Sequence, residues 1–290
     1  MLKKINADAA SFYRWWLTSG NASTELEYVR ERGISEKMQQ VFEIGASPKY
    51  GDTLYRHLIK KYPRKNLLNS GLFLVKEDGS IVDKFYSRVM FPIKDAYGTY
   101  IGFGARKILG SGPKYINSSQ TELFIKRKNL YAFDKARKAR ADFYIVCEGY
   151  MDVIALHQAG FTNAVASLGT ALTIEHCKLM KQSEKKVLLL YDSDDAGMEA
   201  AEKAALLCKE NDLYAAVVRL DGAKDPDEYI KKFGRESFLQ SLGKCEKVDA
   251  FLIKRATQRY RENHDIKSLS DFLIKTYKTP EEIINAVKTI

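Results

Sequence analysis

The sequence is poor in the residues and patterns that mark several classes of protein. It has 4 cysteines and 4 histidines among 290 residues. The cysteines form no C-x-x-C pair and the histidines no pair at metal-ligand spacing, which argues against zinc. No apolar run approaches the ~20 residues of a membrane span, and the first residues lack a signal peptide's apolar core. We therefore expect a cytoplasmic protein with reduced, mostly buried thiols, no zinc in this chain and no membrane contact.

Negative charge is nearly absent from one segment, residues 104–140. This segment has ten Lys and Arg residues, opposed only by Glu122 and Asp134, so it carries +8 of the formal net charge of +10. A dense positive block of this kind is typical of proteins with a polyanionic partner, and nucleic acid leads that class. A solvated, charged helix face is the alternative explanation of the same residues.

The first half of the chain mixes helical and extended patterns. Its opening third reads as helical, and Trp15 and Trp16 recur there at helical spacing, which predicts that both are core residues. Short β-rich runs follow between residues 72 and 108, and Gly102 and Gly104 in the last run predict a close approach of other atoms. We expect a loop over residues 111–119 and a basic helix in the second half of 123–141.

From residue 143 onward, strand and helix patterns alternate regularly. Alternation at this spacing favours a parallel sheet covered by helices on both faces. Residues 248–290 read as a helical tail, and its last apolar-periodic stretch has no visible cap. We therefore expect the chain to be a piece of something longer.

Carboxylates gather after three of the predicted parallel strands. They are Glu148 after the first strand, Asp192, Asp194 and Asp195 after the third, and Asp225, Asp227 and Glu228 after the fourth. Each alone has an ordinary explanation as a turn residue, a helix cap or a charge at a helix N-terminus. The carboxyl ends of parallel strands share one edge of a sheet, however, so a shared cause is favoured. A hard divalent cation such as Mg²⁺ would offset the electrostatic repulsion between these carboxylates. Together with the basic segment, such a cation indicates phosphate chemistry.

Competing motifs fail on their spacing. DSDDAG resembles half of an EF-hand loop, but Lys203 stands where the bidentate glutamate belongs, and a strand precedes the loop. The chain has no Walker loop, and no G-x-G-x-x-G opens a helix after a strand. A D-x-D at a strand end also suggests a haloacid-dehalogenase-type phosphatase, but Asp195 and Ala196 depart from the residues that follow that family's second Asp.

Eight stretches between residues 88 and 229 carry a resemblance to a known family. They are RVMFPI (88–93), IGFGAR (101–106), PKYINS (113–118), LFIKRKNLYAFDKA (123–136), CEGYMDV (147–153), SLGTALT (167–173), YDSDDAG (191–197) and KDPDEY (224–229). In this order they resemble the bacterial DnaG-type primases, and specifically the RNA polymerase core of that family, which contains a Toprim domain.

The resemblance implies a fold and a set of site residues. It implies an α/β fold with a Toprim-type parallel sheet, preceded by a basic mixed α+β subdomain and followed by a helical tail, with boundaries at 1–140, 141–240 and 241–290. It implies catalytic metal ligation by Glu148, Asp192 and Asp194, completed by Asp225 and Asp227. It also implies contacts to nucleotide or template phosphates from Arg106, Lys114 and Lys126, with Tyr115 and Asn117 alongside. Asp195 is instead expected to be a helix N-terminal charge.

The implied function is that of a DNA primase, a nucleotidyltransferase that makes short RNA primers on single-stranded DNA during replication. Mg²⁺ or Mn²⁺, two or more ions, and nucleoside triphosphates would take part, and an RNA–DNA hybrid would be the product. Another Toprim-type nuclease and a non-catalytic single-stranded nucleic-acid-binding module are the alternatives.

Some features depart from the family pattern. Its Gly-Gly-Arg, Asp-Gly-Asp and Asn-Ser-Pro are replaced here by Gly104-Ala105-Arg106, Asp192-Ser193-Asp194 and Asn117-Ser118-Ser119. The family's zinc-binding and helicase-binding domains are not visible, so we expect contact with a replicative helicase only through a domain outside this sequence.

Overall fold

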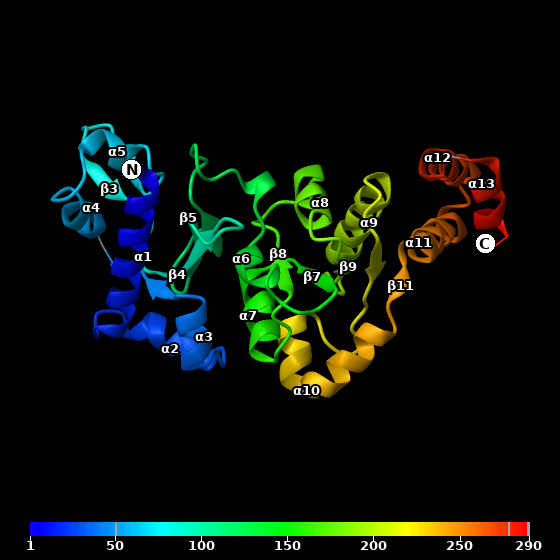
Figure 1. Cartoon of the computed structure of the whole chain (residues 1–290), viewed down its shortest axis with the longest axis horizontal. Coiled ribbons are helices and arrows are strands. Elements are labelled where there is room, and N and C mark those ends of the chain that lie inside the picture. Colours follow the sequence, from blue (N-terminus) through cyan, green and yellow to red (C-terminus); the bar gives the residue numbers. More distant parts are fainter. Residues whose placement is uncertain (50, 278, 289–290) are drawn as a thin grey trace. The chain divides into compact units, whose positions relative to one another are not determined.

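The structure is a computed structural model that describes residues 1–49, 51–277 and 279–288 (Figure 1). Its contacts divide the chain into two compact units. Unit 1 comprises Met1–Arg140 and Gly149–Thr170, and unit 2 comprises Ala141–Glu148 and Ala171–Ile290. The sequence analysis expected three parts, with boundaries at residues 140 and 240. That division stays a prediction.

Unit 1 is a mixed α+β structure. Its helices are α1 (Leu2–Thr18), α2 (Ser23–Glu31), α3 (Glu36–Val41), α4 (Thr53–Leu58), α5 (Arg64–Leu68), η1 (Lys126–Lys128), α6 (Phe133–Ala136) and α7 (Tyr150–Gln158). Its strands are β1 (Gly45–Ala46), β2 (Phe73–Val75), β3 (Ile81–Asp83), β4 (Arg88–Lys94), β5 (Tyr100–Lys107), β6 (Tyr115–Asn117) and β8 (Ala164–Ala166). Strands β1, β4, β5 and β6 form one antiparallel sheet, and β2 and β3 form a hairpin.

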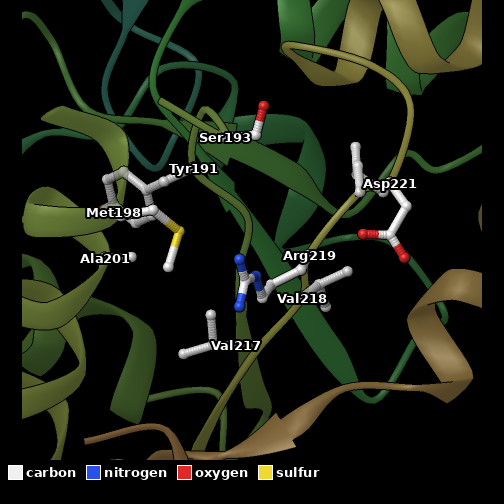
Figure 2. Close-up of a pocket in the computed structure, with 9 residues that line it drawn as sticks. Tyr191, Ser193, Met198, Ala201, Val217, Val218, Arg219 and Asp221 are labelled. Carbon is white, nitrogen blue, oxygen red and sulfur yellow. The ribbon is translucent and has the colours of Figure 1, made fainter. Parts of the chain in front are cut away.

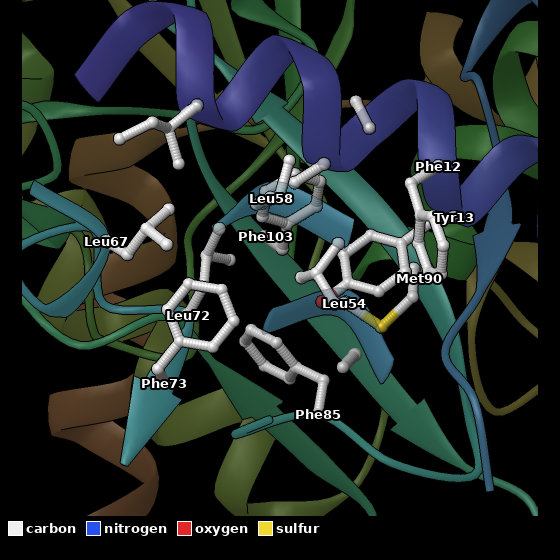
Figure 3. Packing of buried hydrophobic residues seen from close by; sticks show 14 residues of the cluster. Phe12, Tyr13, Leu54, Leu58, Leu67, Leu72, Phe73, Phe85, Met90 and Phe103 are labelled. Atoms are coloured by element: carbon white, nitrogen blue, oxygen red, sulfur yellow. The ribbon is translucent and has the colours of Figure 1, made fainter. Parts of the chain in front are cut away.

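The core of unit 1 lies between α1 and the β-rich segments. Ile5, Ala9, Phe12 and Tyr13 recur with helical periodicity on one face of α1 and are buried. They pack in one cluster with side chains of α4, β4 and β5, as Figure 3 shows for the largest members. This packing gives β5 and β6, which carry predicted site residues, a fixed support.

Three expectations for unit 1 were wrong in part. Trp15 is 54% exposed, because the buried face of α1 is set by Phe12 and Tyr13 and Trp15 lies outside that stripe. Trp16 is half-buried and stacks on Phe12. The predicted loop at 111–119 contains β6, and the predicted basic helix is reduced to the four residues of α6.

Unit 2 contains the alternating α/β region. Its strands are β7 (Phe143–Cys147), β9 (Lys186–Leu189), β10 (Ala215–Val217) and β11 (Glu246–Lys247). Its helices are α8 (Ile174–Lys181), α9 (Asp195–Glu210), α10 (Pro226–Gly243), α11 (Val248–Asn263), α12 (Ile266–Thr276) and α13 (Pro280–Val287). Strands β7, β9 and β10 are parallel neighbours, and β11 adds antiparallel to β10.

The expected α/β class and the helical tail are therefore confirmed. The parallel strands β7, β9 and β10 are mainly apolar and buried, as strands covered on both faces should be. In the tail, Ile253 of α11 packs with Leu273, Tyr277 and Ala286. The last two residues of the uncapped terminal pattern lie outside the described residues.

Three of the four cysteines are buried, as the sequence analysis expected. Cys147, Cys177 and Cys208 are buried free thiols, and Cys245 is an exposed one. Within the described ranges, no helix combines the length and the apolar character needed to cross a lipid bilayer.

Candidate active site

The acidic residues of unit 2 follow the carboxyl ends of parallel strands. Val146 of β7, Leu189 of β9 and Val217 of β10 are level with one another in the sheet register. Glu148 comes directly after β7, and Asp192 comes shortly after β9. Because these strands end at the same edge, the loops that follow them meet there.

The loops after β7 and β9 are joined by a hydrogen bond. The backbone N–H of Asp192 donates to Glu148 Oε1 over 2.9 Å. This bond fixes one oxygen of the Glu148 carboxylate at the position where the next strand ends. A carboxylate can accept about four hydrogen bonds or metal contacts in total, so Glu148 keeps capacity for a cation.

Ser193 ties the loop after β9 to the loop after β10. Its hydroxyl contacts the carbonyl oxygens of Ala223 (3.1 Å) and Lys224 (3.2 Å), and its backbone N–H donates to Lys224 O at 3.0 Å. Sequence analysis noted Ser193 only as a departure from the family's glycine. Its polar side chain between two aspartates was the available signal for this link.

Asp194 and Asp225 each begin a helix. Asp194 Oδ1 accepts from the N–H of Gly197 (2.8 Å) at the start of α9. Asp225 Oδ1 accepts from the N–H of Glu228, also at 2.8 Å, at the start of α10. These caps orient both carboxylates at the N-terminal ends of the two helices. Asp195 lies in the first turn of α9, where it was expected.

Gly197 is required for the close approach of α9 to the Asp192 loop. A Cβ atom at this position would overlap the Asp192 carbonyl oxygen and would lie 2.9 Å from Asp192 Cβ. The glycine in the DSDDAG stretch therefore allows the helix to start directly against the backbone of the acidic loop.

The surroundings of Asp192 affect its ionisation. Burial, together with the charges of Glu148, Asp225 and Asp194, raises the pKa of Asp192 to about 6. Lys224 acts in the opposite direction, but more weakly. The chain thus concentrates negative charge around Asp192 that its own cations do not fully offset.

Asp227 has different surroundings. It is buried, and its carboxylate pairs with Lys231 one helical turn later in α10, with an N–O distance of 2.9 Å. Its predicted part in metal binding stays a prediction.

A small pocket lies next to the Asp192 loop, between α9 and the segment after β10 (Figure 2). Its walls include Tyr191, Met198 and Val218, with Arg219 at its centre in the figure. Its volume is about 70 Å³, roughly the space of two water molecules. A nucleotide is far larger than this pocket.

The donor set fits a hard divalent cation by its chemistry. Mg²⁺ takes oxygen ligands, commonly one or two carboxylates with water and substrate phosphates filling the other positions. In the part of the chain that the structure describes, no three His, Cys, Asp or Glu side chains are already arranged to hold a metal. A bound ion would therefore rely on water or phosphate oxygens in addition to carboxylates.

The predicted phosphate-contacting residues belong to unit 1. Arg106 and Tyr115 are register partners on β5 and β6, and Arg106 Nη1 donates to the Tyr115 hydroxyl at 2.8 Å. Burial raises the pKa of Tyr115, although the Arg106 charge works against this shift. Lys114 is exposed directly before β6, and Lys126 is half-buried at the start of η1.

Asn117 is held by two neighbours. Its Oδ1 accepts from the Tyr150 hydroxyl at 2.6 Å, and its Nδ2 donates to the Leu168 carbonyl at 2.8 Å. The Tyr150 ring stacks on Phe91 and lies where a Cβ on residue 104 would be, which explains the predicted close approach at Gly104. Sequence analysis missed Tyr150 as a support of Asn117, although it stands inside the CEGYMDV stretch.

Two protein-family models match the chain. One, "DNA primase catalytic core, N-terminal domain", matches residues 12–137, and the other, "Toprim-like", matches residues 145–230. The expected Toprim type is thereby confirmed, and a Toprim domain implies the use of a divalent metal.

Individual proteins agree with these matches. The chain is 36% identical over its whole length to the DNA primase of Clostridium acetobutylicum, of which it spans 48%. It spans less than half of the length of the curated relatives that it matches first.

Solved structures match over nearly their full length. The structure of the DnaG primase catalytic domain bound to ssDNA is 30% identical, with a TM-score of 0.86 over 99% of this chain and 96% of that one. The RNA polymerase domain of Mycobacterium tuberculosis primase DnaG, in complex with a double-stranded DNA oligomer with a 6-nucleotide overhang, is 26% identical with a TM-score of 0.83, over 99% of this chain and 95% of that one. The chain therefore belongs to the DnaG primase family and contains its catalytic core, the RNA polymerase domain with a Toprim domain.

Proposed function

We propose that the chain is the catalytic core of a DNA primase, a nucleotidyltransferase that makes short RNA primers on single-stranded DNA. Nucleoside triphosphates would be its substrates and an RNA–DNA hybrid its product. The observation that carries this proposal is the gathering of Glu148, Asp194 and Asp225 around Asp192, whose pKa is raised to about 6 by burial and by these neighbouring charges. Such a site needs a cation, and nucleotidyl transfer is the chemistry that the family performs with one.

The cations would be Mg²⁺ or Mn²⁺, two or more per active site. When bound, they supply charge that lowers the pKa of the primer 3′-hydroxyl and stabilises the leaving pyrophosphate. Glu148, Asp192 and Asp194 would hold them, with Asp225 and Asp227 completing the acidic set. For Asp227 to reach a metal, its ion pair with Lys231 would have to open.

The chain's own residues would act mainly by positioning. The Asp192 N–H holds Glu148, Ser193 joins two acidic loops, and helix α9 holds Asp194. A site fixed in this way does not have to reorganise while charge develops on the transferring phosphoryl group. Phosphoryl transfer depends largely on such positioning and charge neutralisation.

The basic residues of unit 1 would bind the polyanions. Arg106, Lys114 and Lys126 would contact nucleotide or template phosphates, with Tyr115 and Asn117 alongside. The DNA complexes of two similar domains support DNA as the polyanion that this chain binds. We further propose that the protein works in the cytoplasm and meets a replicative helicase through a domain outside this sequence.

Primer synthesis on defined single-stranded templates tests the proposal. The 290-residue chain is given labelled ribonucleoside triphosphates with Mg²⁺, with Mn²⁺ or with a chelator, and a pre-annealed RNA primer separates elongation from initiation. We expect RNA products that require template, nucleotides and metal. DNA nicking without nucleotides would indicate a nuclease, and DNA binding without synthesis under any condition would indicate a non-catalytic module.

A further inference from the structure

We propose that Tyr28 of α2 is a positioning residue for Arg106, and that Tyr28 and Tyr115 together hold its guanidinium ready for a phosphate. This inference rests on the proposed function, in which Arg106 contacts a nucleotide or template phosphate. Tyr28 lies outside every sequence stretch that carried the family resemblance, and only the fold of unit 1 brings it to β5.

Arg106 is flanked by two aromatic rings. Its Cζ atom lies 4.9 Å from the ring centre of Tyr28 and 5.0 Å from that of Tyr115. Both distances are within the range of about 6 Å in which a guanidinium is attracted to an aromatic face. The hydrogen bond of 2.8 Å from Nη1 to the Tyr115 hydroxyl fixes the rotation of the guanidinium plane as well.

Both tyrosines stand on well-anchored elements. Tyr28 stands three residues after Glu25 and directly before Val29, the two residues that α2 buries in unit 1. Tyr115 is paired with Arg106 itself in the β5–β6 register. The ring of Tyr28 is therefore presented by a helix and that of Tyr115 by a strand, and neither depends on a loop.

This arrangement suits an arginine that must meet a phosphate. A free arginine side chain has many rotamers, and stacking on fixed rings removes most of them before a ligand arrives. A guanidinium has five N–H donors, and the protein uses one of them on the Tyr115 hydroxyl. Nε is buried and makes no hydrogen bond in the described part of the chain, so the plane is oriented mainly by stacking and by Nη1.

The binding of a labelled single-stranded oligonucleotide by the 290-residue chain tests the inference through a double-mutant cycle. The variants are Tyr28→Phe, Tyr28→Leu, Arg106→Ala and the double variant Tyr28→Leu/Arg106→Ala. Tyr97→Leu is the matched control, because Tyr97 also lies over an arginine, Arg137 at 5.3 Å, but is 84% exposed and has no assigned role. Thermal unfolding establishes that each variant is folded, and Tyr28→Met replaces Tyr28→Leu if that variant does not fold.

We expect Tyr28→Leu to raise the Kd about three- to tenfold, a change typical of losing one partly buried cation–π contact. Tyr28→Phe keeps the ring and should stay within about twofold of the parent, as should Tyr97→Leu. In the Arg106→Ala background, Tyr28→Leu should cause no further loss of oligonucleotide affinity, because the guanidinium that Tyr28 positions is gone.

The possible failures are distinguishable. If Arg106→Ala leaves the Kd unchanged, the phosphate contact of the proposed function fails, and the positioning role fails with it. If Arg106→Ala weakens binding but Tyr28→Leu does not, only the positioning role is overturned. If Tyr28→Leu weakens oligonucleotide binding equally in the parent and in the Arg106→Ala background, the positioning role is overturned as well, because Tyr28 would then act independently of Arg106.

Discussion

The backbone N–H of Asp192 donates a hydrogen bond to Glu148 Oε1 over 2.9 Å and thereby joins the ends of two neighbouring parallel strands. The bond is made by a backbone donor, so it persists when the charge of residue 148 changes, provided that an oxygen acceptor remains. This separates the structural part of Glu148 from its proposed part in metal binding.

Glu148→Gln should therefore lose metal affinity without losing the fold. The amide oxygen of glutamine can still accept the Asp192 N–H, but one negative charge is removed from the site. We expect the affinity for Mn²⁺, measured by calorimetric titration, to fall by about tenfold or more, while the thermal midpoint stays near that of the parent. Primer synthesis should fall with the affinity. Unchanged Mn²⁺ binding and near-normal synthesis would contradict the assignment of Glu148 as a ligand.

Gly197→Ala should damage the acidic loop, whereas Gly243→Ala should not. The new methyl at residue 197 would overlap the Asp192 backbone, and an overpacked site of this kind costs about 1–3 kcal/mol of unfolding free energy. A Cβ on Gly243 meets nothing within 4 Å, so the second variant controls for the loss of a glycine in α10. Chemical denaturation measures the free energy of unfolding of both variants. Equal stability of the two would show that α9 can move away from Asp192 at no cost.

The stability of unit 1 should depend on pH through His157. This ring is buried, its Nε2 lies 2.9 Å from the Ala164 carbonyl oxygen, and burial lowers its pKa to about 4. In the unfolded chain the ring has a pKa of about 6.5, so on acidification the unfolded state binds the proton first. The contribution of His157 to the free energy of unfolding is fully present above about pH 6.5. It is lost as the pH falls towards 4, and the loss amounts to at most about 3 kcal/mol.

The comparison of the parent with His157→Gln isolates this effect. A glutamine amide can donate to the same carbonyl but does not titrate in this range. The difference in unfolding free energy between the two proteins should shrink as the pH falls from 7 to 4. A difference that is constant over this range would mean that His157 titrates equally in the folded and unfolded states.

Lys114→Ala and Arg106→Ala should weaken the binding of single-stranded DNA and make it less sensitive to salt. Each phosphate contact on a single strand contributes about 0.7 to the slope of log K against log salt concentration. The slope should therefore become shallower by about that amount in each variant. Lys65→Ala, an exposed lysine on α5 outside the basic segment, is the control and should keep the parent slope. Identical slopes in all proteins would exclude Arg106 and Lys114 as phosphate contacts.

The sequence predicted the acidic edge because its signals are local. An apolar run followed by a carboxylate marks a strand end, and the alternation of strands with helices implies that such ends share one edge. Glu148 and Asp192 are found at this edge for that reason. The cap at Asp194 and the first-turn position of Asp195 likewise follow from residues within one helical turn.

The features that the sequence analysis did not predict depend on which residues the fold brings together. Strand β6 lies in a polar stretch that reads as a loop, and it is extended because Tyr115 pairs with Arg106 of β5. Trp15 looked like a core residue by its type, but α1 can bury one face only, and Phe12 and Tyr13 occupy it. The links of Ser193 to the loop after β10, of Tyr150 to Asn117 and of Tyr28 to Arg106 leave no periodic trace in the sequence.

Primer synthesis by Asp192→Asn, side by side with Asp195→Asn, is the most direct test of the proposed metal site. Each variant removes one negative charge, and the two positions are three residues apart. Asp192 is surrounded by other carboxylates, whereas Asp195 is an exposed first-turn residue of α9. On a defined single-stranded template with labelled nucleotides and Mg²⁺ or Mn²⁺, Asp192→Asn should lose synthesis by about a hundredfold or more, and Asp195→Asn should remain close to the parent. Comparable synthesis by the two variants would contradict the assignment of Asp192 as a catalytic metal ligand.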